Sequence, residues 1–257
     1  MPSVEQKQIV PLFKSNFSIG KSILTLDPVV DSDLQNIETY PNGPKSIFGI
    51  LSEENLTELI LLEDNFYSFY SAYTHCKNNK IKLIYGINFQ YKEGDYFSRV
   101  SVFMKNKLGY RDLILLDAKR NEKGFLEFTD LKNLLTANLL LTIPFYDSFI
   151  HSNSMTFSKF SDALLSMSPV FFLEDNGLPF DDIIRKSVVD ICGDRFELLE
   201  SKTICYYKRS DIEAFLTYKC ICNRSFGKKS LAKPNFDHFS SDEFCWESYK
   251  ERAAKDG

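Results

Sequence analysis

The stretch Leu59–Phe89, LILLEDNFYSFYSAYTHCKNNKIKLIYGINF, contains a strand, a helix and a second strand in succession. Its first residues belong to a short apolar run, Leu56–Leu62, of the kind that forms a strand buried on both faces. Tyr67–Asn79 places aromatic residues on one face of a helical pattern, and Lys80–Phe89 has the composition of a strand. A strand–helix–strand unit of this kind is typical of a parallel sheet.

The same alternation continues on both sides of this unit. Before it, Ser46–Glu54 carries apolar residues at helical spacing. After it, helical and strand patterns alternate through most of the remaining chain. The further predicted strands are Arg99–Lys105, Asn138–Ile143, Pro169–Leu173 and Thr203–Tyr207, and the further predicted helices are Tyr110–Ala118, Phe180–Ile191, Asp211–Cys222 and Ser241–Ala254.

The predicted strands have no consistent polar face, as expected when both faces of a sheet are covered. We therefore expect an α/β fold with mainly parallel strands, either a barrel or a doubly wound layer, in a single domain that spans residues 1–257. Residues 226–257 are expected to form a surface-wrapping tail with a terminal helix, whose first turn Ser241 caps. The strands expected to be parallel in one closed sheet are Leu59–Leu62, Ile81–Tyr85, Val100–Phe103 and Leu139–Ile143.

Composition and charge exclude several classes of protein. With 31 basic and 35 acidic residues the formal net charge is -4, so we expect contact with DNA to be weak or indirect. The polar segment Met1–Val10 lacks an apolar signal core, and no run approaches the ~20 apolar residues of a membrane span. We expect a cytoplasmic protein without membrane association. Gly20-Lys21-Ser22 ends like a phosphate loop, but Ser15 stands where that loop needs a glycine, so we expect no cofactor.

Two segments place acidic residues directly after predicted strands. Glu63 and Asp64 follow Leu56–Leu62, and Asp147 follows Asn138–Ile143. Loops at the carboxyl ends of parallel strands converge, so metal ligation or acid–base catalysis is one interpretation. The other interpretation is a solvated loop that caps the next helix. The residues alone leave both open.

Several segments resemble the PHP domain of bacterial DNA polymerase III alpha subunits. Leu59–Phe89 aligns without a gap with that family's strand, its T-D-H-G-N turn, its helix and its I-K-P-I-I-G-x-E-F segment. The matching segments run in the family's order from Phe13 to Tyr249, although Gly124–Ser168 matches poorly. The supporting segments are Phe13–Lys21 (FKSNFSIGK), Phe103–Ile114 (FMKNKLGYRDLI), Asp175–Pro179 (DNGLP), Asp211–Cys222 (DIEAFLTYKCIC) and Phe239–Phe244 (FSSDEF).

The resemblance implies a PHP-type distorted TIM-like (β/α)7 barrel whose metal site is degenerate. Metal-binding members use an H-x-H-x-H-S cluster, the D-H pair, the glutamate of G-x-E and a late D-x-H. Valine and leucine supply no ligand atom and a lysine repels a cation, so we expect no bound metal and no catalytic residue. Glu63, Asp64, Asn88, Asp147 and Cys205 remain as weak ligands for a single cation. The family's ligand positions fall on Val10, Leu12, Lys14, Leu62, Glu63, Asn88, Thr203 and Cys205.

The resemblance also implies a role and a partner. We expect a non-catalytic scaffold or docking module of a DNA replication assembly, which binds a polymerase or proofreading exonuclease subunit. The chain would be free-standing, part of a split polymerase, or a viral homologue in the host cytoplasm. One alternative is a divergent metal-dependent phosphoesterase or 3′–5′ exonuclease that uses Glu63, Asp64 and Asp147. Another is an interaction protein unrelated to replication.

Three aromatic residues near the end of the sequence are candidates for partner binding. Phe244, Trp246 and Tyr249 lie in one short segment, and Trp246 is the only tryptophan. Aromatic residues of this kind are enriched at binding hot spots. The alternative is that their rings pack the last helix onto the barrel.

Overall fold

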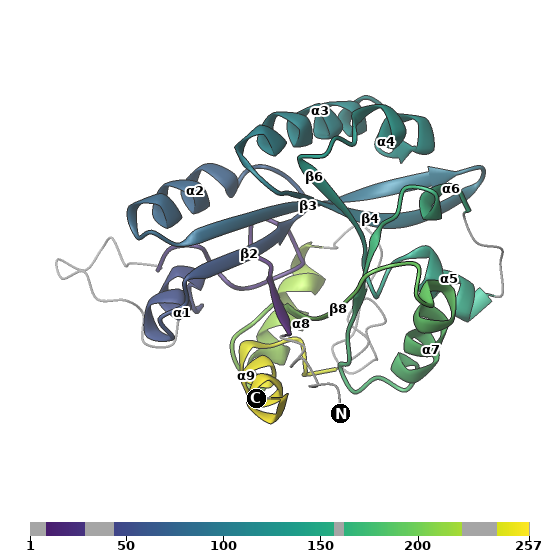
Figure 1. The fold of residues 1–257 in the computed structure, drawn as a ribbon. Helices are drawn as coiled ribbons and strands as arrows, with labels where there is room; N and C mark the ends of the chain where they lie inside the picture. Colours follow the sequence, from purple (N-terminus) through teal and green to yellow (C-terminus); the bar gives the residue numbers. More distant parts are fainter. Residues whose placement is uncertain (1–8, 29–43, 157–161, 223–240, 257) are drawn as a thin grey trace, which may run out of the picture. The chain divides into compact units, whose positions relative to one another are not determined.

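The computed structural model describes residues 9–28, 44–156, 162–222 and 241–256 (Figure 1). The chain forms two compact units. Unit 1 comprises Met1–Val10 and Ile84–Ser201, and unit 2 comprises Pro11–Leu83 and Lys202–Gly257. Residues 226–240 of the predicted surface tail lie outside the described residues.

Unit 2 holds the strands and helices at both ends of the described chain. Strand β1 pairs with β2 in parallel, with Phe13 opposite Leu61. Helix α1 begins where the sequence predicts, because the Ser46 hydroxyl accepts a hydrogen bond from the Gly49 amide (2.9 Å) and caps the first turn. The elements of unit 2 are β1 (Val10–Phe13), α1 (Ile47–Glu53), β2 (Glu58–Glu63), α2 (Phe69–Asn78), η1 (Arg209–Asp211), α8 (Ile212–Cys222) and α9 (Trp246–Asp256).

Helices α1 and α2 pack against each other through one side of α2. Ala72 and Cys76 of α2 are buried, and the His75 ring stacks on Phe48 of α1 with centroids 3.6 Å apart. Burial lowers the pKa of His75, so this ring is neutral at pH 7. His75 therefore contributes to the packing of α2 on α1 through its ring.

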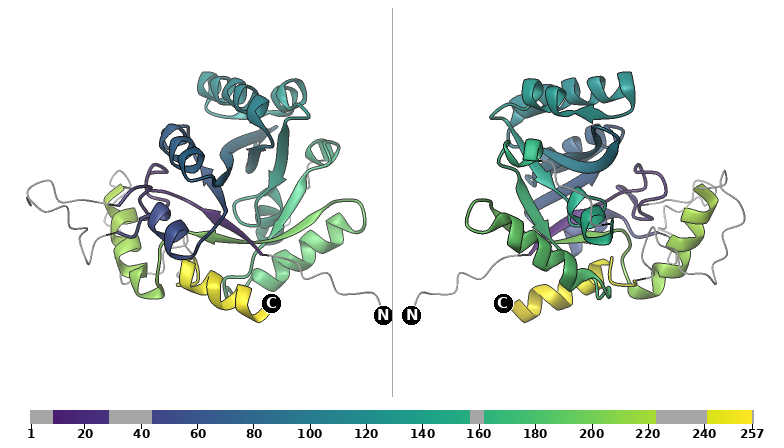
Figure 2. Two further views of the ribbon diagram at one scale, coloured as in Figure 1. Left: turned by 60° about the vertical axis from the view of Figure 1, so that its left-hand side comes forward. Right: turned by 90° about the vertical axis from the view of Figure 1, so that its right-hand side faces the viewer.

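Unit 1 contains the antiparallel part of the sheet and its own helices. Helices α3 and α4 lie side by side (Figure 2), and α5 packs on α7. The first two residues of β3 and the last three of β8 belong to unit 2. The elements are β3 (Lys82–Glu93), β4 (Tyr96–Met104), α3 (Lys107–Lys123), β5 (Leu126–Glu127), α4 (Phe128–Leu134), β6 (Leu139–Ile143), α5 (Phe149–Thr156), α6 (Asp162–Leu165), β7 (Val170–Leu173), α7 (Asp181–Cys192) and β8 (Leu198–Ile204).

Hydrogen bonds connect the described strands in the order β2-β1-β8-β7-β6-β4-β3-β5. Because β2 also pairs with β3, the order of seven strands returns to its start, as in a TIM-like barrel, and β5 is added at the side of β3. The neighbours β6–β7 and β7–β8 are parallel. The predicted α/β class with a closed strand order is confirmed.

The prediction that Val100–Phe103 is a parallel strand is wrong. Strand β4 is antiparallel to both β3 and β6. It forms a hairpin with β3 that closes at Gly94, where φ is +58°, a value that favours glycine. The sequence between the predicted strands Lys80–Phe89 and Arg99–Lys105 is shorter than the dozen or so residues that a parallel crossover needs, so an antiparallel turn is the only short connection.

The predicted start of the last helix is also wrong. Helix α9 begins at Trp246, and Ser241 does not cap it. Before the helix the chain is extended: the Cys205 amide donates to the Phe244 carbonyl (2.9 Å), and Cys245 forms a parallel bridge with Tyr206. These backbone bonds hold the segment in an extended conformation and delay the first helical turn.

Gly86 provides a test of the hairpin. It lies opposite Phe103, and a Cβ atom there would come within 2.5 Å of the Phe103 ring. We predict that Gly86→Ala lowers the free energy of unfolding by about 1–3 kcal/mol, because a buried ring must move. Chemical denaturation measures the change. The double variant Gly86→Ala/Phe103→Leu should lose less than the sum of the single variants, and additive losses would contradict this packing.

Candidate functional site

A buried carboxylate lies at the carboxyl end of β2 in unit 2. The Glu63 side chain has no exposed surface. Its Oε1 atom accepts hydrogen bonds from the Ser15 amide (3.1 Å) and the Ser15 hydroxyl (2.5 Å), and its Oε2 atom accepts one from the Ser18 hydroxyl. The Ser18 oxygen in turn accepts from the Asp64 amide (2.8 Å). Both carboxylate oxygens are therefore occupied by donors from the same chain.

The serine donors come from a loop that folds back on itself directly after β1. The Ser18 amide donates to the Ser15 carbonyl (3.1 Å), and the Lys21 amide donates to the Ser18 carbonyl (2.9 Å). Gly20 allows this path, since its φ of +72° lies in the left-handed region. The Ser22 hydroxyl then donates to the Cys205 carbonyl (2.8 Å). Gly20-Lys21-Ser22, the segment that resembles the end of a phosphate loop, thus follows the turn in which Ser15 and Ser18 bind Glu63, and Ser22 bonds to Cys205 instead.

The protonation of Glu63 reflects its burial. Removal from water raises its pKa to about 7, and the hydrogen bonds from Ser15 and Ser18 oppose that rise. No cation among the described residues forms an ion pair with it. A carboxyl group with a pKa near 7 is suited to general acid–base catalysis. The Glu63 side chain is fully buried, so a substrate cannot contact it in this structure.

The other positions that the resemblance links to metal ligands include buried apolar residues and an amide that is already hydrogen-bonded. Leu12 and Leu62 are buried apolar residues, and the buried Asn88 amide accepts a hydrogen bond from the Ser101 hydroxyl (2.7 Å). No group of three or more His, Cys, Asp and Glu among the described residues is arranged to hold a metal ion. The remaining positions are Val10 in β1, Lys14 just after it, Thr203 in β8 and the buried Cys205.

Asp147 lies in unit 1, whereas Glu63 and Asp64 lie in unit 2. Its carbonyl accepts from the Arg99 amide of β4 (3.1 Å), and its carboxylate lies 3.8 Å from the Arg99 guanidinium. Its φ of +60° is uncommon for a residue other than glycine. Within unit 1 its contacts hold the loop after β6 against β4.

A polar network that the sequence did not predict lies at the ends of β6 and β7. The Tyr146 hydroxyl donates to Asp181 Oδ1 (2.7 Å), and Asp181 Oδ2 accepts from the amides of Asn176 (2.8 Å) and Leu178 (3.0 Å). The Asn176 side-chain amide also donates to Glu174 (3.1 Å). Burial raises the pKa of Tyr146, so it stays a donor. The sequence feature that could have indicated this network is the DNGLP segment, Asp175–Pro179. The network fixes the turn that this segment forms.

The three candidate aromatic residues pack α9 within unit 2. Phe244 and Trp246 are buried, and the Trp246 ring stacks on Phe13 (5.4 Å) and on Tyr249 (4.8 Å). The Trp246 amide donates to the Tyr206 carbonyl (3.0 Å), which satisfies one of the unpaired donors at the start of α9. These rings hold the last helix in place.

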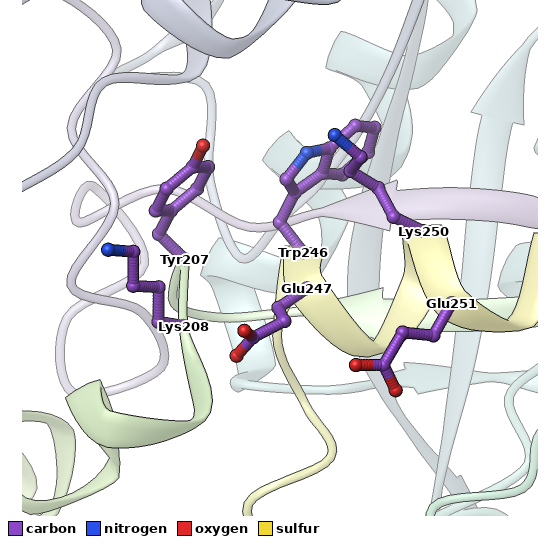
Figure 3. Close-up of a pocket in the computed structure, with 6 residues that line it drawn as sticks. All are labelled: Tyr207, Lys208, Trp246, Glu247, Lys250 and Glu251. Carbon is purple, nitrogen blue, oxygen red and sulfur yellow. The ribbon is translucent and has the colours of Figure 1, made fainter.

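A pocket of about 270 Å³ lies beside Trp246 (Figure 3). Three of its charged side chains, Glu247, Lys250 and Glu251, have partners within unit 2. Glu251 binds the Arg209 guanidinium through two contacts of 2.8 Å, Glu247 accepts from the Arg209 amide (3.0 Å), and Lys250 pairs with Glu54 (2.6 Å). The pocket is a by-product of the ion pairs that attach α9. Its lining residues are Tyr207, Lys208, Trp246, Glu247, Lys250 and Glu251.

No protein-family model matches this chain, and no curated protein matches its sequence. None of the helices in the described part of the chain is long and apolar enough to span a membrane.

The titration of Glu63 predicts a pH-dependent stability. Its pKa in the folded protein is about 7, above the ordinary 4.5, so the native state holds the proton more tightly. This contribution is complete below about pH 4.5 and is lost as the pH rises through about 7, by up to about 3 kcal/mol. Glu63→Gln should therefore lose less stability than the wild type between pH 5 and pH 8 in chemical denaturation. Asp64→Asn is the matched control, and an equal pH dependence in all three proteins would refute the assignment.

The packing of Trp246 predicts a large loss of stability on truncation. Trp246→Ala should lower the free energy of unfolding by about 3–5 kcal/mol, since it removes a buried ring stacked on two others. Glu247→Ala, an exposed neighbour on the same helix, should lose much less. A melting temperature unchanged in Trp246→Ala would show that the ring does not pack the helix.

Proposed function

We propose that this chain is a non-catalytic, PHP-like docking module of a cytoplasmic DNA replication assembly. The observation that carries the proposal is the closed environment of Glu63, where Ser15 and Ser18 donate to both carboxylate oxygens. A metal-dependent phosphoesterase needs carboxylate oxygens that are open to a cation and a water molecule. The residue at the family's ligand position is instead used to hold the β1–β2 end of unit 2 together.

The resemblance to the polymerase III alpha subunit supplies the class of partner. Proteins in which a metal site has been replaced by packing groups, as at Leu12 and Leu62, keep their fold for another purpose. In the family that purpose is attachment to a polymerase or a proofreading exonuclease subunit. The partner we propose is a polymerase subunit or a proofreading exonuclease subunit, with DNA contact weak or indirect.

Helix α3 of unit 1 offers an exposed apolar face for that partner. Leu113 and Leu116 point into the unit, whereas Leu108 is 69% exposed and Leu115 is 47% exposed. These two leucines are seven residues apart and lie on one line along the helix. Ile114 is also exposed, and the charged residues Arg111 and Asp112 lie between the two leucines on the same side of the helix. Exposed apolar residues bordered by polar ones are typical of protein interaction sites.

The test is capture of polymerase and exonuclease subunits by the full chain. Leu108→Lys/Leu115→Lys should reduce capture about tenfold or more, because charges replace the exposed anchors of the interface. Ile183→Lys/Val189→Lys, on the exposed side of α7, is the matched control with the same chemistry. Both double variants should keep the wild-type melting temperature.

Equal capture by wild type and the α3 variant would contradict the docking surface. Manganese-dependent hydrolysis of a phosphodiester that disappears in Glu63→Gln would contradict the non-catalytic role.

A further inference from the structure

The exposed side of α2 in unit 2 carries a row of tyrosines followed by lysines. Tyr67, just before the helix, is 77% exposed, and Tyr70 is 78% exposed. Tyr73, Lys77 and Lys80 are also exposed. Tyr70, Tyr73 and Lys77 follow each other by three and four residues, which places them on one side of α2. Tyr67 lies just before the helix, and Lys80 lies just after it with a φ of +57°. We call these five residues the tyrosine–lysine stripe.

The rest of α2 holds the stripe in a fixed orientation. Ala72, Cys76 and the His75–Phe48 stack attach another side of the helix to unit 2. At its N-terminal end the Phe69 ring stacks on Tyr73 (5.9 Å) and meets Phe66 edge to face (6.1 Å). The Tyr73 ring is thus held by Phe69, while Tyr67 and Tyr70 are largely exposed to solvent.

The lysines of the stripe have no acidic partner in the part of the chain that the structure describes. The ion pairs of this unit use other lysines, such as Lys45 with Glu53 and Lys82 with Glu58. Lys77 and Lys80 therefore offer two positive charges beside exposed aromatic rings. Tyr70 and Lys77 are about 10 Å apart along the helix axis, which is the span of a few nucleotides.

We propose that the tyrosine–lysine stripe binds single-stranded nucleic acid. Unpaired bases stack on exposed aromatic faces irrespective of sequence, and lysines contact the phosphates that follow. A duplex keeps its bases stacked on each other and offers no free base to Tyr67 and Tyr70. The net charge of -4 belongs to the whole chain, and the stripe itself is positive. This role goes beyond the proposed protein docking and uses a different helix.

The experiment is fluorescence anisotropy of the full chain with a labelled oligothymidine, at several salt concentrations. Tyr67→Ala/Tyr70→Ala should weaken binding about tenfold or more, and Tyr67→Phe/Tyr70→Phe should bind like the wild type because the ring faces remain. Lys77→Ala/Lys80→Ala should make the dependence of log K on log salt shallower by about 1.4, the value for two phosphates of a single strand. Tyr96→Ala, an equally exposed tyrosine of unit 1, is the control.

Three results would overturn the proposal. The first is equal binding by the wild type and Tyr67→Ala/Tyr70→Ala, and the second is tighter binding of a duplex than of the single strand. The third is that the wild type does not bind the oligonucleotide while Tyr67→Ala/Tyr70→Ala loses partner capture. The last result would assign the stripe to a protein partner. The α3 variant Leu108→Lys/Leu115→Lys should bind the oligonucleotide normally, so a failure of the docking proposal is distinguishable from a failure of this one.

Discussion

The Glu63 carboxylate, closed off from water at the end of β2, constrains the part of unit 2 around it. Burying a carboxyl group is costly unless hydrogen bonds replace those of water. The donors that replace them are Ser15 and Ser18, which reach the carboxylate only if the loop after β1 folds back. Phe13 lies opposite Leu61 in the parallel pair, so Ser15 and Glu63 are the next residues of the same register. A slip of β1 along β2 would leave the carboxyl group without donors.

The same strand connects this register to the last helix. Phe13 is the last residue of β1, before the loop that contains Ser15 and Ser18. Its ring stacks on Trp246 of α9. The attachment of α9 is completed by Arg209, which binds Glu243 and Glu251 through its guanidinium. A buried ring stack and an exposed ion-pair network therefore act on one helix. The stack supplies most of the stabilisation, since exposed ion pairs contribute little.

The sequence predicted the order of the larger elements well, because their signals are local. The apolar spacing of Ser46–Glu54 predicted α1 almost to the residue, and the structure shows that Ser46 caps its first turn. The predicted direction of β4 was wrong because buried strands have similar apolar sequences in parallel and antiparallel sheets. The position of Glu63 after a strand was visible, but its two serine partners were not, since they lie 48 and 45 residues earlier. The burial of the aromatic residues could not be predicted either. Trp246 is buried against Phe13, whereas Tyr67 and Tyr70 have no such stacking partner among the described residues.

The division of unit 2 between two distant segments has a consequence for how the chain folds. Pro11–Leu83 leaves the ribosome before Ile84–Ser201, and Lys202–Gly257 follows only after that. In unit 1 the hairpin and the helices bring together residues that are close in sequence. The loops between them are short, so closing them costs little entropy. The Phe13–Trp246 and Glu54–Lys250 contacts join residues with a large sequence separation, and such contacts carry a high entropic cost of closure. Until Trp246 is synthesised, the face of β1 that it covers is exposed, and a nascent chain in that state is a substrate for chaperones.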